Sequence, residues 1–161
     1  MKWIYIAVFF LVPSAAMADT CQLNINATDL MRFEQQTLQI EPQCTAVEVT
    51  LHHIGKLAAN AMGHDWVLTK TADIAAVANA GISAGLANSF QKPGDTRILA
   101  STKIIGGGES STVRFSTAQL EPGTSYSYFC SAPGHFSAMK GRLIVSSTNS
   151  LRGGEKLSLP P

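Results

Sequence analysis

Polar and apolar residues alternate along several short stretches of the chain, which is the pattern of half-buried β-strands. The clearest stretch is 46–53, where the odd-numbered residues up to His53 share one face and most of the even-numbered ones are polar. A second alternation places Tyr126, Tyr128 and Cys130 on one face. Further strands are expected, some on weaker signals, at 22–25, 38–40, 112–115, 125–129 and 142–145.

One stretch has the spacing of a helix instead. Residues 71–87 are rich in alanine and carry apolar residues at helical intervals. Thr71 or Asp73 could begin this helix, and Gly81 could end it. Short antiparallel strands with one helical excursion predict an all-β fold, a Greek-key β-sandwich with one short helical insertion.

The two ends of the chain differ in composition from the part between them. Residues 1–18 combine Lys2, an apolar run over 3–12 and a small-x-small pattern ending at Ala18, which predicts a signal peptide cleaved after Ala18. The apolar run is too short to favour the alternative of a membrane anchor. Residues 19–147 are expected to form one domain, and the polar segment 148–161 is expected to be a flexible tail.

Charge and cysteine content narrow the function further. Lys2 is the only charged residue before residue 19, so the mature chain carries 11 basic and 11 acidic residues. It shows no basic stripe for a nucleic acid or an anionic membrane. Three cysteines in an exported chain favour one disulfide, which we assign to Cys21 and Cys44. Cys130 is then left as a thiolate.

Metal-ligand chemistry gathers around that third cysteine. Cys130, His135 and Met139 fall within ten residues between two expected strands, and the segment 62–66 offers a second imidazole at His64. Singly, each of these residues more often packs in a core than binds a metal. Together, two imidazoles, a thiolate and an axial thioether predict a blue-copper site with one ion, because zinc rarely takes a thioether.

The segments around these ligands resemble those of the azurins, the bacterial members of the cupredoxin family. The likeness covers Met62-Gly63-His64-Asp65-Trp66 and Cys130-x4-His135-x3-Met139-Lys140-Gly141, and it extends from about Cys21 to Val145. It implies a Greek-key β-sandwich with a helical flap, and a soluble periplasmic protein that shuttles electrons. It also implies that the backbone carbonyl of Gly63 lies opposite Met139 on the copper axis.

The resemblance also suggests residues outside the ligand set. His53 would lie partly buried beside the copper, with a satisfied core histidine as the alternative. An apolar patch would surround the exposed edge of His135 and dock redox proteins such as c-type cytochromes or reductases. Its residues are Met31, Leu57, Met62, Ile82, Pro133 and Gly134.

The chain departs from the azurin pattern at several positions. Asp65 stands where azurins generally have asparagine, so it is expected either to lower the reduction potential or to be kept protonated. Ala132, Ala138 and Phe136 reshape the expected patch. The leading interpretation is an electron carrier with no enzymatic activity. A copper-delivery protein and a Cys130-dependent thiol hydrolase or reductase are the alternatives.

Overall fold

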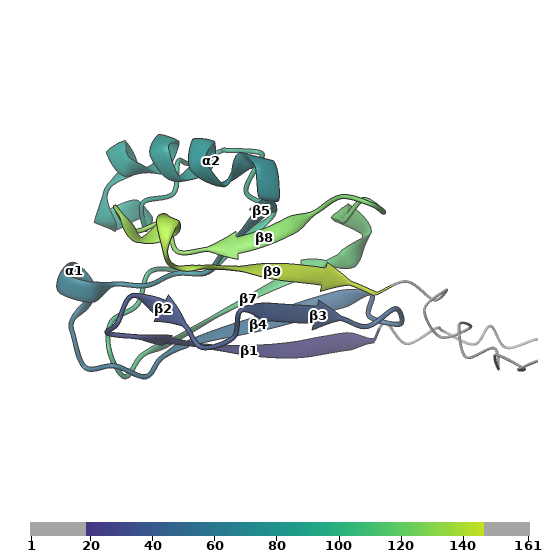
Figure 1. The fold of residues 1–161 in the computed structure, drawn as a ribbon, viewed down its shortest axis with the longest axis horizontal. Helices are drawn as coiled ribbons and strands as arrows, with labels where there is room; N and C mark the ends of the chain where they lie inside the picture. The colour runs from purple at the N-terminus through teal and green to yellow at the C-terminus, as the bar shows by residue number, and fades with distance from the viewer. Residues whose placement is uncertain (1–18, 147–161) are drawn as a thin grey trace, which may run out of the picture.

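The computed structural model describes residues 19–146, and within them the chain folds into two β-sheets packed face to face (Figure 1). The expected signal peptide and tail lie outside the described residues. One sheet has the strand order β2-β1-β4-β7 and the other β3-β9-β8-β5-β6. The strands are β1 Thr20–Thr28, β2 Arg32–Phe33, β3 Thr37–Ile40, β4 Ala46–His53, β5 Val67–Lys70, β6 Ala100–Ser101, β7 Ser110–Ser116, β8 Tyr126–Phe129 and β9 Lys140–Val145.

The strand pairing is mixed, although the sequence predicted antiparallel neighbours. β1 runs parallel to β4, and β3 runs parallel to β9, while the remaining pairs are antiparallel. The parallel pairs arise because the chain crosses between sheets: β3 joins the second sheet before β4 returns to the first. Such crossings are typical of Greek-key sandwiches, so the predicted fold class is confirmed.

The core lies between the sheets and follows the predicted alternation of β4. Val47, Val49 and Leu51 are fully buried and His53 is nearly so, while the residues between them are partly exposed. Cys21 of β1 forms a disulfide with Cys44, just before β4, as predicted. The bridge therefore joins two neighbouring segments of the first sheet.

Strand β8 is buried on both faces, which its alternating sequence did not predict. Tyr126 and Tyr128 face the main core, while Phe129 packs with Val67, Val77 and Ala78 in a separate apolar cluster. The helix that covers this outer face is α2, Ile74–Gly81 (Figure 1). The helical insertion therefore explains why serine and aromatic residues are equally buried in β8.

The helical insertion begins and ends close to its predicted bounds. It consists of η1 Thr71–Asp73, α2, η2 Ile82–Ala84 and η3 Leu86–Asn88, in which η denotes a 3₁₀ helix. Helix α2 ends at Gly81, where a Cβ atom would overlap the backbone of Phe90. Asp73 precedes α2 without a capping hydrogen bond from its side chain. The structure adds a one-turn helix, α1 Ala59–Met62, that the sequence did not predict.

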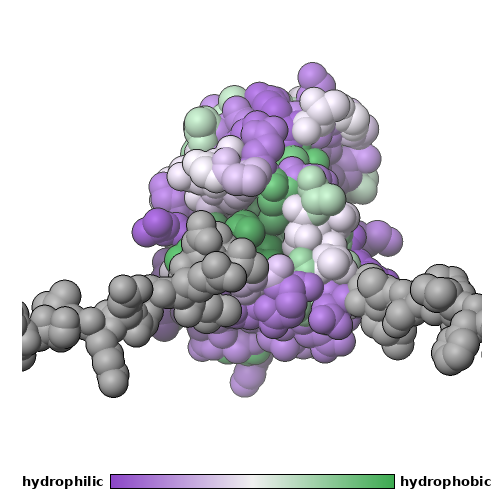
Figure 2. Space-filling model, turned by 90° about the vertical axis from the view of Figure 1, so that its right-hand side faces the viewer, coloured by the Kyte–Doolittle hydropathy of each residue, from purple (hydrophilic) through white to green (hydrophobic). Residues whose placement is uncertain are grey.

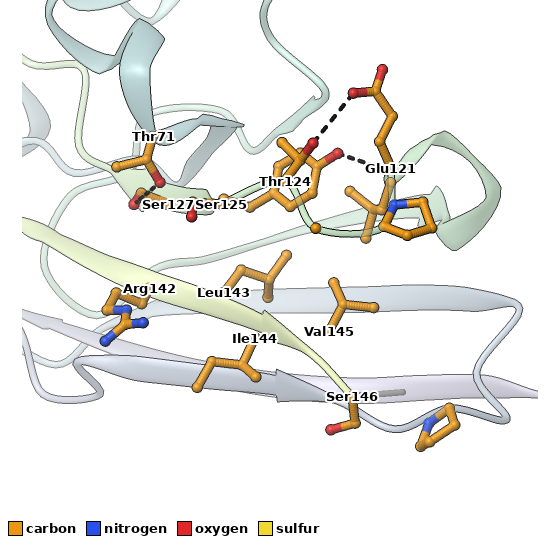
Figure 3. A pocket seen from close by; sticks show the side chains of 15 residues that line it. Thr71, Glu121, Thr124, Ser125, Ser127, Arg142, Leu143, Ile144, Val145 and Ser146 are labelled. Atoms are coloured by element: carbon orange, nitrogen blue, oxygen red, sulfur yellow. Dashed lines mark hydrogen bonds between the residues drawn. The ribbon is translucent and has the colours of Figure 1, made fainter. Parts of the chain in front are cut away.

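The two ends of the sandwich differ in character. The loop between β8 and β9 lies at the same end as α1, and β9 leads out at the other end (Figure 1). That other end shows apolar atoms between polar rims (Figure 2) and a hollow of about 690 Å³. Leu143 and Val145 extend toward Thr124 across this hollow (Figure 3). The hollow is not lined by His64, Cys130 or His135. Within residues 19–146 no helix is long and apolar enough to cross a membrane.

Candidate metal centre

The loop from Cys130 to Met139 is closed by backbone hydrogen bonds at its base. Phe129 of β8 pairs with Lys140 of β9, and the Cys130 N–H donates to the Met139 carbonyl at 3.0 Å. The Met139 N–H donates to the His135 carbonyl at 2.7 Å. Just before His135, Gly134 has φ +83°, a conformation that favours glycine. These bonds fix the backbone of the loop that carries the three side chains with ligand chemistry.

The second imidazole comes from a different part of the chain. His64 forms an isolated antiparallel bridge with Ile105, through backbone hydrogen bonds of 3.0 and 2.8 Å. Its ring nitrogen Nε2 lies 3.0 Å from the Thr28 carbonyl, to which it can only donate. That bond fixes the tautomer, so Nδ1 is left as an acceptor that can bind a metal.

His64, Cys130 and His135 form one buried cluster, with their ligand atoms within 4.8 Å of one another. Cys130 Sγ lies 3.8 Å from Nδ1 of His64 and 3.5 Å from Nδ1 of His135. The Gly63 carbonyl lies 3.9 Å from the same sulfur, and Met139 is fully buried. A thiol flanked by two imidazole nitrogens is the donor set of a blue-copper ion, so these residues fit that metal.

Burial sets the electrostatics of the cluster. It lowers the pKa of His64 to about 4, with a further contribution from nearby His53, and it lowers the pKa of His135. Burial raises the pKa of the Cys130 thiol well above its ordinary value. Both imidazoles are therefore neutral at pH 7 and ready to bind a metal. The thiol loses its proton only when a cation takes the proton's place.

Asp65 links the segment that carries His64 to the loop that begins at Cys130. Its Oδ1 accepts the Ser131 N–H at 2.7 Å, and its Oδ2 lies 2.5 Å from Ser131 Oγ and 2.8 Å from Gln91 Nε2. Ser131 Oγ is also 2.8 Å from the Ser89 carbonyl. One hydroxyl hydrogen cannot serve two acceptors, whereas a proton on Oδ2 satisfies both contacts. Burial raises the pKa of Asp65, in agreement with a neutral carboxyl group.

His53 lies against His64 with its ring centroid 4.5 Å away. Its Nε2 is 3.0 Å from Asp29 Oδ1, and its buried Nδ1 has no hydrogen-bond partner within residues 19–146. The Asp29 carboxylate also accepts backbone N–H groups of Lys56 at 2.8 Å and Leu57 at 3.3 Å. The Lys56 bond is the main cause that lowers the pKa of Asp29. The sequence did not single out Asp29 because it lies far from His53 along the chain.

The six residues of the expected patch are accessible. Leu57 and Ile82 are 45% and 50% exposed. Pro133 and Gly134 are exposed, and Met31 and Met62 are partly buried. His135 itself is 7% exposed, while His64, Cys130 and Met139 are fully buried. Among these side chains His135 is therefore the one that reaches the surface.

Comparisons with known proteins agree with the geometry. Residues 19–146 match the family of copper-binding proteins described as the plastocyanin/azurin family. The azurin of Bordetella pertussis is 50% identical over 127 residues, covering 79% of this chain and 85% of that protein. The azurin of Pseudomonas chlororaphis is 45% identical and covers 78% of this chain and 98% of its own.

Comparison with a solved structure shows the same similarity at the level of the fold. An azurin (Az-iso2) of Methylomonas sp. strain J superimposes with a TM-score of 0.77 at 40% identity, over 79% of this chain and 98% of that one. Its fold, the sequence match and the buried His–Cys–His cluster all lead to one assignment. The chain belongs to the plastocyanin/azurin family of copper-binding proteins, and it is a blue-copper electron-transfer protein.

Proposed function

We propose that one type 1 copper ion would be held by Nδ1 of His64, Sγ of Cys130 and Nδ1 of His135, together with two weaker donors. These are the thioether of Met139 and the carbonyl of Gly63. The observation that carries this proposal is the Cys130 thiol lying within 3.8 Å of both imidazole nitrogens in a buried cluster. The bound ion supplies the one-electron couple between Cu(I) and Cu(II).

The protein's own contribution is to keep the ligands in place whichever charge the ion carries. The backbone bonds that close the 130–139 loop and the bond from His64 to Thr28 do not depend on a metal. Complete burial of Cys130 keeps water from the sulfur. A site that changes little between oxidation states needs little reorganisation, which favours fast electron transfer.

Electrons enter and leave through the ring of His135, the ligand that reaches the surface. The surrounding patch of Met31, Leu57, Met62, Ile82, Pro133 and Gly134 docks c-type cytochromes or reductases transiently. The mature chain has as many acidic as basic residues. Its docking therefore depends on apolar contact and not on a strong net charge.

The protein acts in the periplasm after cleavage behind Ala18, and it does not act as an enzyme. The Cys21–Cys44 disulfide fits an oxidising compartment. A Cys130-dependent hydrolase or reductase would need an accessible thiolate, but this sulfur belongs to a residue with no exposed surface and its pKa is raised. His53 packs against the ring of His64, and Asp65 bonds Ser131, the residue after Cys130.

The test is the visible and paramagnetic-resonance spectrum of the protein loaded with Cu(II). Cys130→Ser should abolish the intense blue band, which arises from charge transfer between the thiolate and copper. His52→Gln is the matched histidine control, because His52 lies on the outer face and bonds Ser110 and Asn24. A blue Cys130→Ser protein would refute the ligand assignment. An electron carrier should oxidise a reduced c-type cytochrome, whereas a copper-delivery protein should lose its copper to a chelator. Measuring both reactions separates the two.

A further inference from the structure

A polar side chain from the segment that follows the helical insertion reaches the residues next to the candidate ligands. Gln91 follows η3 and is far in sequence from every proposed ligand, yet it bonds the carboxyl group of Asp65. We propose that Gln91 is a positioning residue of the copper centre, which acts through Asp65 on the segments that carry His64 and Cys130. The inference rests on the ligand assignment proposed above.

The hydrogen bonds of the Gln91 amide fix its orientation. Its Nε2 donates to Asp65 Oδ2 at 2.8 Å and to the Thr102 carbonyl at 2.9 Å. Its Oε1 accepts the Ser101 hydroxyl at 2.7 Å. Both amide hydrogens and the amide oxygen are therefore engaged. Turning the amide over would face its oxygen toward two acceptors, so the amide is held in one orientation.

From Asp65 the network reaches both ligand segments. Asp65 directly follows His64, and its two oxygens contact the backbone N–H and the hydroxyl of Ser131, which directly follows Cys130. The segment after the insertion makes a second contact at the same place, from Ser131 Oγ to the Ser89 carbonyl at 2.8 Å. Gln91 is thus one step from the residue next to His64 and two steps from the residue next to Cys130.

Thr102, whose carbonyl accepts the second hydrogen bond of Gln91, is itself bonded to Trp66, close to His64. Thr102 Oγ1 accepts the N–H of Trp66 at 2.9 Å, and the Thr102 N–H donates to the Trp66 carbonyl at 3.0 Å. Gln91 therefore ties the 101–102 segment to the stretch that includes His64. The bonds of Gln91 are partly buried. Such bonds hold polar groups in one arrangement, and loss of one donor leaves its acceptor unsatisfied.

Two consequences follow if the Gln91 donor is removed. The Asp65 carboxyl becomes less restrained, so the Ser131 N–H that it accepts opens to solvent more often. Without the Gln91 N–H, the partial negative charge on the Asp65 oxygen is also less compensated. More negative charge beside the ion favours Cu(II) and so lowers the reduction potential. A residue that only filled space would change neither quantity.

Gln91→Met tests this, because methionine has a similar length and no strong hydrogen-bonding group. In the metal-free protein, exchange of the Ser131 amide hydrogen should become about tenfold faster, while the amide of Leu51 in the core of β4 reports global stability. In the copper-loaded protein the reduction potential should fall. Gln119→Met is the control. Within residues 19–146 that amide bonds the Leu99 carbonyl at 3.3 Å and none of the residues around the ligand cluster.

A double-mutant cycle with Asp65→Asn shows whether Gln91 acts through Asp65. Either orientation of an asparagine amide there sets its nitrogen against another donor, Gln91 Nε2 or the Ser131 N–H. Gln91→Met should therefore have a much smaller effect on Ser131 exchange when Asp65→Asn is already present. Equal effects in both backgrounds, or no effect of Gln91→Met on exchange and potential, would overturn the proposal. A protein that never turned blue would refute the copper assignment, while the metal-free exchange would still test Gln91.

Discussion

Acid should destabilise the metal-free protein through His64. Burial, together with nearby His53, lowers the pKa of His64 from 6.5 to about 4. In the unfolded chain the imidazole keeps a pKa of about 6.5. Between these values the unfolded chain binds a proton that the folded chain does not, so acid favours unfolding. Titration of His64 therefore leaves the free energy of unfolding unchanged above pH ~6.5 and lowers it as the pH drops toward 4.

The size of the effect follows from the width of this window. One proton changes the free energy of unfolding by about 1.4 kcal/mol per pH unit, so a window from about 6.5 to about 4 gives about 3 kcal/mol. That is a large share of the roughly 5–15 kcal/mol that stabilises a typical domain. His135, whose pKa is also lowered by burial, adds an effect of the same sign. Asp65 acts in the opposite sense because burial raises its pKa.

The contribution of His64 is isolated by comparison with His64→Gln, in which the other groups still titrate. Urea unfolding can be followed by fluorescence of Trp66, which is fully buried and is the only tryptophan after residue 18. The free energy of unfolding of the wild type minus that of the variant should fall by about 3 kcal/mol from pH 7 to pH 4. A difference that stays constant with pH would refute the reasoning. So would a titration midpoint of the His64 ring near 6.5 in the metal-free protein.

Three further substitutions test other parts of the structure. Met139→Ala should leave a blue protein with a higher reduction potential, measured by voltammetry, because an axial thioether tunes the ion without being essential for binding; loss of the blue band would contradict this. Asp65→Asn replaces a neutral carboxyl with an amide of the same charge, so it should change the potential at neutral pH far less than removal of a full negative charge would, and a large rise would show that Asp65 is ionised. Gly141→Ala should lower the free energy of unfolding by about 1–3 kcal/mol, because the added Cβ would overlap the Tyr128 hydroxyl; an unchanged urea midpoint would contradict it.

Local patterns in the sequence predicted the sandwich and the loop that carries Cys130, His135 and Met139. The alternation ending at His53 depends only on neighbouring residues, and the structure buries that face. Cys130, His135 and Met139 are close in sequence, so one loop had to bring them near each other. The double burial of β8 could not be predicted this way, because it depends on α2 packing across its outer face.

The supporting groups of the cluster escaped prediction for a related reason. Asp29 is 24 residues from His53, and Gln91 is 26 residues from Asp65. A hydrogen bond between such distant side chains leaves no periodicity or spacing in the sequence. Asp65 was noticed only as a departure from the azurin pattern, and its contacts with Ser131 and Gln91 required the fold.

The charge on Asp65 determines in which oxidation state of copper the proposed site carries no net charge. With a neutral Asp65, a thiolate and Cu(I) sum to zero, while a thiolate and Cu(II) leave one positive charge in a buried pocket. Burial of an uncompensated charge is unfavourable, so this arrangement favours the reduced ion and a higher potential. An ionised Asp65 would shift the balance by one charge and favour Cu(II). The protonation state of Asp65 beside Ser131 therefore bears directly on how readily the centre accepts an electron.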